Sequence, residues 1–332
     1  MESLPIKYRP KEFCDVCSQS SVIKILERQV ATGNFKNCYL FSGASGCGKT
    51  TIARILANKI NKGVGEPIEI DAASNNGVDN VRKIIDGADQ RSLDSEYKIY
   101  IVDECHMLTT QAWNALLKTI EETPKYTIFM FCTTEYHKVP VTIQNRCQQY
   151  FLTRVPIKDI ENRLYYICEQ ENFTAHPDGI THIAKLSLGS MRQAIAYLEK
   201  CKDYSTNITL DNVLTVLGDF SYDVYFKLVN AVIDKNREDI INVIEDIYNK
   251  GNDLKLFFDM FIGFVLDLTK YIIFKSFDVI KIPESYKDKI EYTVNVEDAV
   301  KYYNHLLDTL LDIKVSLKGD NDVKTTLEIS LI

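Results

Sequence analysis

The apolar positions in residues 1–154 follow two different periods. Short, mostly apolar runs are typical of strands buried on both faces, and they cover residues 38–41, 98–102 and 126–132, while residues 67–70 are a further short strand candidate. Between these runs, apolar residues recur every three or four positions, as in amphipathic helices, over residues 50–59, 77–88 and 110–121. This alternation predicts a parallel sheet with helices on both faces.

The remaining residues are helical in pattern. Pro156 and Pro177 can each open a helix, Ser190 and Thr209 can cap two more, and Gly218 can end the last of these. Longer helical patterns follow over residues 229–248 and 254–274. The second is apolar nearly all round, so it is either deeply buried or covered by a partner.

These patterns predict three domains in the 332 residues. We expect an α/β domain over residues 1–154, a small helical domain over residues 155–218 and a second helical domain over residues 219–332. A hydrophobic fraction of 45% excludes wholesale disorder.

Charge is unevenly spread. The net charge is −7, and residues 219–332 carry 14 Lys and Arg against 21 Asp and Glu, whereas residues 1–150 carry 18 against 17. A nucleic-acid contact in the first half therefore stays open. No apolar run approaches the ~20 residues of a membrane helix, and the N-terminus lacks a signal-peptide pattern. We expect a cytoplasmic protein with no membrane partner.

The nine cysteines are scattered, mostly in apolar stretches. Cys14 and Cys17 form one Cys-x-x-Cys pair, but a structural zinc site needs four ligands and no second pair has a suitable spacing. We expect no zinc.

A phosphate-binding loop follows the first apolar run. The segment Gly43-Ala44-Ser45-Gly46-Cys47-Gly48-Lys49-Thr50 matches Gly-x-x-x-x-Gly-Lys-Ser/Thr between a strand and a helix. Its backbone N–H groups would cradle phosphates, Lys49 would reach the β- and γ-phosphates, and Thr50 would ligate Mg²⁺. The pattern predicts that this loop binds ATP.

Two carboxylates follow the buried run at residues 98–102. Because ligands bind at the carboxyl ends of strands in such sheets, Asp103 is placed to hold Mg²⁺ and Glu104 to polarise an attacking water.

These motifs occur in the order found in AAA+ ATPases, and the chain resembles the clamp-loader ATPase subunits: bacterial tau/gamma, the small subunits of replication factor C, and their phage counterparts. The resemblance is dense over residues 5–200 and rests on helical pattern over residues 219–332. The motifs are Lys7-Tyr8-Arg9-Pro10, Glu69-Ile-Asp-Ala-Ala-Ser-Asn-Asn-Gly77, Asp103-Glu104-Cys105-His106, Thr133-Thr134-Glu135, Asn145-Arg146-Cys147 and Gly189-Ser-Met-Arg192.

The resemblance implies roles for further residues. Thr134 resembles sensor 1, although Thr133 is an alternative. Arg146 resembles the arginine finger that acts in trans on a neighbouring subunit's ATP. Arg192 resembles sensor 2 on the lid helix. Arg9, Val16 and Cys17 resemble the segment around the adenine, and Thr51 continues the phosphate loop.

The chain also departs from the family pattern. Asn145 replaces a serine before the finger arginine, and Cys17-Ser18-Gln19 lacks the glycine of Val-Gly-Gln. The four-cysteine zinc module of cellular tau/gamma subunits is absent from residues 59–67. This compact build suits a phage or otherwise reduced loader.

In the family, helix N-termini and a few polar side chains track primer-template DNA. The matching positions are Asn75, Asn76, Arg82, Lys83, Thr109 and Thr110. These residue types bind phosphates without reading sequence, but on their own they equally suit an ordinary solvated helix face with caps.

The resemblance therefore implies a DNA-stimulated ATPase subunit of a sliding-clamp loader that uses ATP and Mg²⁺. Its expected partners are the clamp, primer-template DNA and other loader subunits in a pentamer. The main alternative is another AAA+ DNA motor, such as a helicase loader or branch-migration translocase. The intact Lys49, Asp103, Glu104 and Arg146 argue against an ATP-binding scaffold without turnover, and Asp103-Glu104 with Arg192 argue against a small-molecule kinase.

Overall fold

The computed structural model describes residues 2–317, 319 and 322–331. The chain forms two compact units. The first comprises Met1–Ile167 and Ser187–Glu199, and the second Cys168–Leu186 and Lys200–Ile332. Residues 155–218 are thus shared between the units, and the predicted three-domain division stays a prediction.

The first unit contains the parallel sheet that the apolar runs predict. Its five strands lie in the order β2-β3-β4-β1-β5, and every neighbouring pair is parallel. The strands are β1 (Cys38–Gly43), β2 (Ile68–Asp71), β3 (Lys98–Asp103), β4 (Thr127–Thr133) and β5 (Gln148–Leu152). The sequence pattern predicted four of these strands and missed β5, one of the two edge strands, in which Gln148 and Phe151 are exposed.

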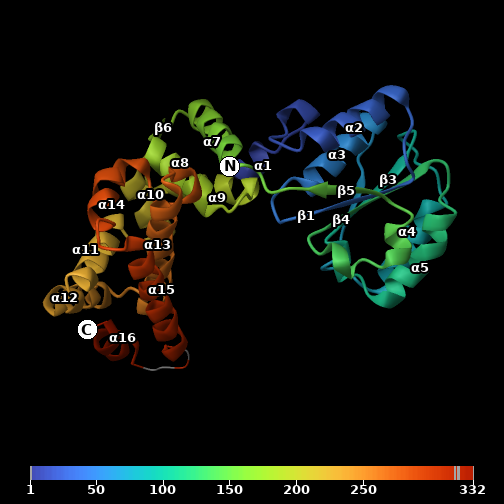
Figure 1. The fold of residues 1–332 in the computed structure, drawn as a ribbon. Coiled ribbons are helices and arrows are strands. Elements are labelled where there is room, and N and C mark those ends of the chain that lie inside the picture. The colour runs from blue at the N-terminus through green and yellow to red at the C-terminus, as the bar shows by residue number, and fades with distance from the viewer. Residues whose placement is uncertain (1, 318, 320–321, 332) are drawn as a thin grey trace. The chain divides into compact units, whose positions relative to one another are not determined.

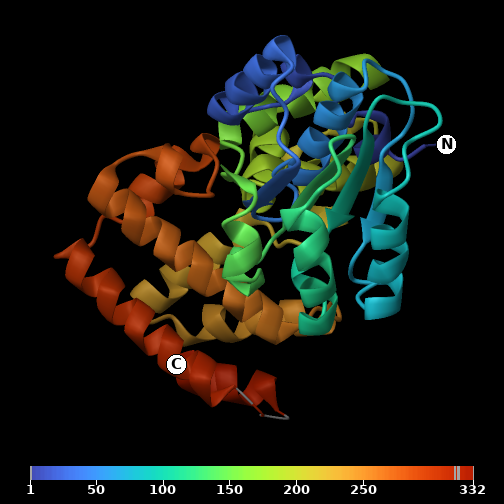
Figure 2. The same cartoon turned by 90° about the vertical axis from the view of Figure 1, so that its right-hand side faces the viewer.

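Helices cover both faces of this sheet, as expected (Figures 1 and 2). Apolar residues of α2 (Ser20–Thr32) and α3 (Lys49–Ile60) pack on one face. Those of α4 (Val78–Ala88), α5 (Thr110–Glu121) and α6 (Val141–Gln144) pack on the other. Continuous burial of both faces explains why the central strands are apolar at every position.

Shorter elements and two longer helices complete the first unit. The short elements are α1 (Leu4–Lys7) and the 3-10 turns η1 (Phe13–Asp15), η2 (Cys105–Met107) and η3 (Tyr136–Lys138). Helices α7 (Ile157–Glu171) and α9 (Met191–Tyr204) begin in this unit and end in the second. They lie where Pro156 and Ser190 predict helix starts.

The second unit is helical apart from one pair of two-residue parallel strands, β6 (Thr174–Ala175) and β7 (Asn207–Ile208). Its other elements are α8 (Pro177–Leu186), α10 (Leu210–Leu217), α11 (Tyr222–Ile233), α12 (Arg237–Asn249), α13 (Leu254–Phe274), η4 (Phe277–Val279), η5 (Glu284–Tyr286), α14 (Lys287–Thr293), α15 (Ala299–Ser316) and α16 (Val323–Leu331). Helix α10 has the predicted ends: the Thr209 hydroxyl accepts from the Asn212 N–H, and Gly218 takes φ +73°.

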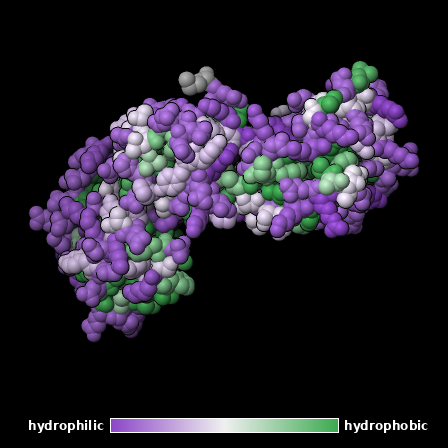
Figure 3. Space-filling view, turned by 90° about the horizontal axis from the view of Figure 1, so that it is seen from above, coloured by the Kyte–Doolittle hydropathy of each residue, from purple (hydrophilic) through white to green (hydrophobic). Residues whose placement is uncertain are grey.

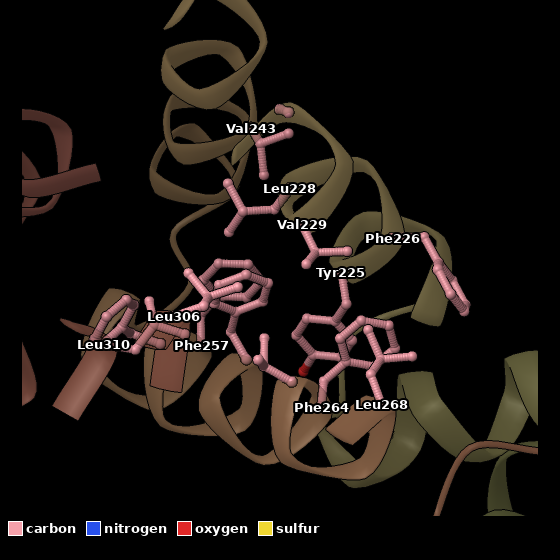
Figure 4. Close-up of a cluster of buried hydrophobic side chains, with 14 of the residues drawn as sticks. Tyr225, Phe226, Leu228, Val229, Val243, Phe257, Phe264, Leu268, Leu306 and Leu310 are labelled. Carbon is pink, nitrogen blue, oxygen red and sulfur yellow. The ribbon is translucent and has the colours of Figure 1, made fainter. Parts of the chain in front are cut away.

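The mostly apolar helix α13 lies in the hydrophobic core of the second unit. Its buried aromatic residues, including Phe257 and Phe264, pack against α11, α12 and α15 (Figure 4). Leu256 and Phe274 of α13 stay exposed. Figure 3 shows other apolar residues as separate patches on a mostly hydrophilic face. Burial within the unit therefore accounts for most of the apolar pattern of α13.

One helical prediction was wrong. Residues 229–248 do not form a single helix, because the chain breaks between α11 and α12. Lys235 adopts a left-handed conformation (φ +55°), and the Asn236 side chain caps α12 by accepting from the Asp239 N–H. This reversal lets both apolar faces reach the same core, which a continuous helix would prevent.

Candidate functional site

The phosphate loop joins β1 to α3, as its sequence predicts. The Lys49 Nζ donates to the carbonyl oxygens of Gly43 and Ala44, 3.0 Å from each. Gly43, Gly46 and Gly48 all have positive φ. A Cβ at Gly43 would lie 2.4 Å from the Leu152 carbonyl oxygen, so only glycine fits there without a shift of backbone.

The loop also contacts the start of α9. A Cβ at Gly46 would lie 2.0 Å from the Ser190 hydroxyl, and the Met191 N–H donates to the Gly46 carbonyl over 3.2 Å. Arg192 is in the first turn of this helix. Together with the phosphate loop, it lines a pocket at the carboxyl end of the sheet. The geometry brings the predicted sensor arginine to the phosphate loop.

Thr50 and Asp103 meet at the carboxyl end of the sheet. The Thr50 hydroxyl donates to Asp103 Oδ2 over 2.7 Å, although the two residues are far apart in sequence. A hydroxyl and a carboxylate are the oxygen ligands that Mg²⁺ prefers, so this pair fits the ion that an ATP site requires.

Glu104 lies beside this pair. Its backbone is left-handed (φ +46°), and its N–H donates to Asp103 Oδ1 over 2.9 Å. The Thr134 hydroxyl donates to Glu104 Oε2 over 3.2 Å. Thr133, the alternative sensor, is fully buried, and its hydroxyl oxygen lies 3.1 Å from His106 Nδ1. Thr134 is thus the threonine that contacts Glu104.

The N-terminal segment forms another wall of the pocket. Arg9, Val16 and Cys17 line it together with loop residues from Ser45 to Thr51. Burial, with the nearby cations Arg54 and Arg192, lowers the pKa of Arg9. Several cations therefore face a space that opens on two carboxylates, an arrangement suited to a phosphate chain and its metal ion.

Ser18 replaces the family's glycine at the edge of this wall. Its backbone is left-handed (φ +67°), and its buried hydroxyl has no hydrogen-bond partner in the part of the chain that the structure describes. The next residue, Gln19, is also left-handed, and its amide donates to the Thr153 carbonyl over 2.7 Å. Both residues thus adopt a backbone conformation that costs free energy in residues other than glycine.

Sequence reasoning missed part of the pocket. Arg163 of α7 lines it, and its guanidinium donates to the Tyr8 carbonyl over 2.9 Å. Tyr8, Val155 and Ile195 contribute further lining. No motif marks Arg163 or Ile195, because only the packing of α7 and α9 brings them to the loop.

Arg146 lies outside this pocket. Its guanidinium donates to the Thr142 carbonyl over 2.6 Å and forms an ion pair with Glu121 of α5. The side chain is about one third exposed, at 35%. A partly exposed arginine away from the chain's own phosphate loop has the placement that a trans-acting finger needs.

The six residues predicted from the resemblance to contact DNA lie around the N-terminal ends of α4 and α5. These two ends are adjacent, because the Thr109 N–H donates to the Asn76 carbonyl over 3.2 Å. Arg82 and Lys83 are exposed on α4, and Arg82 pairs with Asp79. Thr109 caps α5 by accepting from the Ala112 N–H, Thr110 is the first residue of α5, and Asn75 donates to the Asp71 carbonyl.

The cysteine pair makes no visible metal site. Cys14 is exposed, whereas Cys17 belongs to the pocket wall. Within residues 2–317, 319 and 322–331, no group of three or more His, Cys, Asp or Glu is arranged to hold a metal ion. The same residues include no helix long and apolar enough to cross a membrane.

The sheet order, the phosphate loop and the Asp103–Glu104 strand end define a P-loop protein of the AAA+ class. Solved structures agree on the fold. The Thermotoga maritima RuvB Holliday junction branch migration motor gives a TM-score of 0.53 at 20% identity, covering 69% of this chain and 80% of that chain. A point mutant of the same protein gives 0.55 at 19% identity, covering 70% and 81%. Such low identity shows the fold alone.

Within this class the chain belongs to the family of DNA polymerase III gamma/tau subunits. The family model "DNA polymerase III subunits gamma and tau domain III" matches residues 208–332, and "DNA polymerase III, delta subunit" matches residues 66–156. The family match thus extends through the last third, where the sequence offered only length and helical pattern.

Curated relatives carry the same name. DNA polymerase III subunit gamma/tau of Mycoplasma genitalium is 33% identical over 314 residues, which cover 88% of this chain and 52% of the relative. Subunit tau of Bacillus subtilis is 36% identical over 280 residues, covering 77% and 50%. That of Escherichia coli is 32% identical over 267 residues, covering 74% and 42%. The chain thus spans about half the length of these relatives.

Proposed function

We propose that the chain is an ATPase subunit of a sliding-clamp loader, which uses ATP to open a clamp and place it on primer-template DNA. The main support comes from three features that meet at the carboxyl ends of the strands: the phosphate loop, the Thr50–Asp103 pair and the Glu104–Thr134 pair. Membership of the gamma/tau family supports the clamp and the DNA as partners.

Each residue at this edge has a definite part in hydrolysis. Lys49 and the loop N–H groups hold the phosphates, and Thr50 and Asp103 would hold Mg²⁺, which would supply neutralisation of phosphate charge. Glu104 takes a proton from water as the water oxygen bonds to the γ-phosphorus. The bond from that phosphorus to the bridging oxygen breaks, and ADP leaves with the electron pair. Arg192 senses the γ-phosphate from the start of α9.

Arg146 acts on the ATP of a neighbouring subunit in this proposal. Its contact with Glu121 keeps the guanidinium on the surface of its own subunit. A guanidinium delivered in trans stabilises transition-state charge, and this couples hydrolysis to assembly. We propose a pentamer of loader subunits, in which the same or different chains surround the DNA.

The adjacent starts of α4 and α5 supply the DNA contact. Helix N–H groups and the exposed Arg82 and Lys83 bind phosphates without reading bases. One subunit offers few charges, so several subunits along one duplex are needed for tight binding. DNA bound in this way stimulates hydrolysis, which then releases the closed clamp.

Steady-state ATP hydrolysis tests this function, with the purified chain assayed alone, with primer-template DNA, and with candidate partner subunits and clamp added. We expect stimulation by DNA that Arg146→Ala abolishes while ATP binding, measured by equilibrium titration, is retained. Arg237→Ala, which changes an arginine at the exposed start of α12, is the matched control and leaves turnover unchanged.

Two results would contradict the proposal. Hydrolysis that stays indifferent to DNA after partner and clamp are added would favour another AAA+ motor, and a preference for branched over primer-template DNA would favour a branch-migration role. An unchanged rate in Arg146→Ala would remove the trans-acting finger.

A further inference from the structure

His106 follows the catalytic strand end and has no part in the mechanism described so far. It lies in η2, two residues after Glu104, and its side chain is only 7% exposed. Its two ring nitrogens face two different carboxylates: Nδ1 lies 3.4 Å from Glu104 Oε2, and Nε2 lies 3.3 Å from Glu135 Oε1. A buried imidazole thus lies between the water-polarising carboxylate and a second carboxylate.

Contacts from β4 and its C-terminal end hold the ring in place. The Thr133 hydroxyl oxygen lies 3.1 Å from Nδ1 and also accepts from the Glu135 N–H over 2.9 Å. Glu135 in turn pairs with Lys138 over 2.8 Å. Because the ring is buried and contacted at both nitrogens, it has little freedom to turn.

The contact with Glu104 has a consequence for the carboxylate. The two contacts to its side chain, from His106 and from Thr134, fall on the same oxygen, Oε2. They therefore set the rotation of the carboxyl group and leave Oε1 for the attacking water. Glu104 itself has a left-handed backbone (φ +46°), so its side chain leaves the strand in an unusual direction.

We propose that His106 is a positioning residue of the ATPase site, which acts through Glu104 and is held by Thr133 and Glu135. This inference rests on the proposed hydrolysis. When the water oxygen bonds to the γ-phosphorus, Glu104 must accept the water proton along a narrow range of directions. His106 and Thr134 together keep the carboxylate in that range.

The test measures single-turnover hydrolysis of radiolabelled ATP by the full chain with primer-template DNA, and ATP affinity separately. We expect His106→Ala to lower the hydrolysis rate roughly 10- to 100-fold and to change ATP affinity less than about twofold, because only orientation is lost. His106→Asn places an amide nitrogen near the position of Nδ1 and recovers part of the rate. Thermal unfolding of each variant checks that it is folded.

A double-mutant cycle separates positioning from a merely structural role. In the Glu104→Gln background, His106→Ala should cause no further loss, because the carboxylate that it orients is gone. His305→Ala, in the exposed part of α15, is the matched control and leaves the rate unchanged.

Three results would overturn the proposal. The first is a wild-type hydrolysis rate in His106→Ala, and the second is an equal fold-loss of rate from His106→Ala in the wild-type and Glu104→Gln backgrounds. The third is a folded His106→Asn variant whose hydrolysis rate is no higher than that of His106→Ala. If the wild-type chain hydrolyses no ATP under any of these conditions, the proposed function itself fails, and the wild-type arm alone reveals that.

Discussion

Two buried histidines, one in each compact unit, have similar partners but different surroundings. In the first unit, His106 contacts Glu104 and Glu135. In the second, His182 Nε2 lies 2.9 Å from Asp219 Oδ2, and its Nδ1 lies 3.2 Å from the Tyr222 hydroxyl. Both imidazoles are held at both nitrogens, and both side chains are more than nine-tenths buried.

The partners of the two histidines differ in access to solvent. The Glu104 and Glu135 side chains are 37% and 36% exposed, and Glu104 lines the pocket of the phosphate loop. The Asp219 side chain is only 9% exposed, and Tyr222 is buried in the helical core. A histidine beside a carboxylate is therefore not a functional site by itself. His182 and Asp219 also line a pocket of the second unit, so open space alone does not separate the two sites. The phosphate loop distinguishes the first, because Glu104 shares its pocket with Lys49 and Thr50.

The largest expected effect tests whether the carboxylate beside His106 takes part in hydrolysis. Glu104→Gln should lower the rate of ATP hydrolysis about 10²- to 10³-fold and leave ATP binding intact, because the amide cannot accept the water proton. Single-turnover hydrolysis and equilibrium ATP titration measure the two quantities. Glu27→Gln, on the exposed face of α2, is the control. Equal losses of binding and turnover would show that Glu104 holds the nucleotide instead.

His182→Ala tests whether the histidine of the second unit has a structural role. We expect it to reduce the free energy of unfolding by about 3 kcal/mol, because Asp219 loses its partner within a buried site. Urea unfolding followed by circular dichroism measures this loss. Hydrolysis per folded molecule should not change. His305→Ala should leave the midpoint unmoved, and a His182→Ala chain as stable as the wild type would remove the structural interpretation.

Alkaline pH should destabilise both units. Burial raises the pKa of Tyr222, Tyr225 and Tyr303 in the second core, and raises that of Tyr39 in the first unit to about 12. Above about pH 10 the unfolded chain loses these protons and the folded chain keeps them. Stability present below pH 10 is therefore lost as the pH rises, by up to about 1.4 kcal/mol per pH unit for each fully buried tyrosine.

The first unit should lose stability as well, because burial raises the pKa of Cys38, Cys105 and Cys132, whose thiols ionise first in the unfolded chain as the pH rises. Trp113, the single tryptophan, is buried against the sheet of the first unit, so its fluorescence follows that unit alone. Circular dichroism follows both units, and the second is mostly helical. Fluorescence and circular dichroism that both stay unchanged as the pH rises through 11 would contradict the prediction.

The smallest expected effect concerns strain near the pocket. Ser18→Gly should raise the free energy of unfolding by about 1 kcal/mol, because glycine adopts a positive φ freely and removes an unpartnered buried hydroxyl. Ser21→Gly, in the first turn of α2, is the matched control and should destabilise by about 0.5 kcal/mol. Thermal unfolding compares the two. A loss of stability in Ser18→Gly would show that the serine side chain contributes an interaction.

Much of the fold could be predicted from periodicity. The apolar runs identified four strands, and the helix boundaries at Thr209, Gly218 and residues 254–274 agree with the structure. The prediction of one helix over residues 229–248 failed because the apolar spacing continues through a reversal of the chain. Lys235 turns the chain without a glycine or proline to mark the break. Strand β5 was not predicted because it begins with Gln148 and Gln149 and so lacks a long apolar run.

The candidate site divides in the same way. The phosphate loop and the Asp103–Glu104 strand end could be predicted, because phosphate binding and metal binding each need residues at fixed spacing on one turn or one strand. Arg163 and the Glu121 contact of Arg146 have no local pattern, because they depend on how helices pack.

The sequence by itself determined the parallel sheet, the phosphate loop and the gamma/tau resemblance, because each depends on residues close together in the chain. The tertiary structure alone decided that Thr134 rather than Thr133 contacts Glu104, that His106 lies between two carboxylates, and that α13 is largely buried within its own unit. Adjacent residues on a strand point to opposite faces, and only the packed neighbours determine which face meets the site.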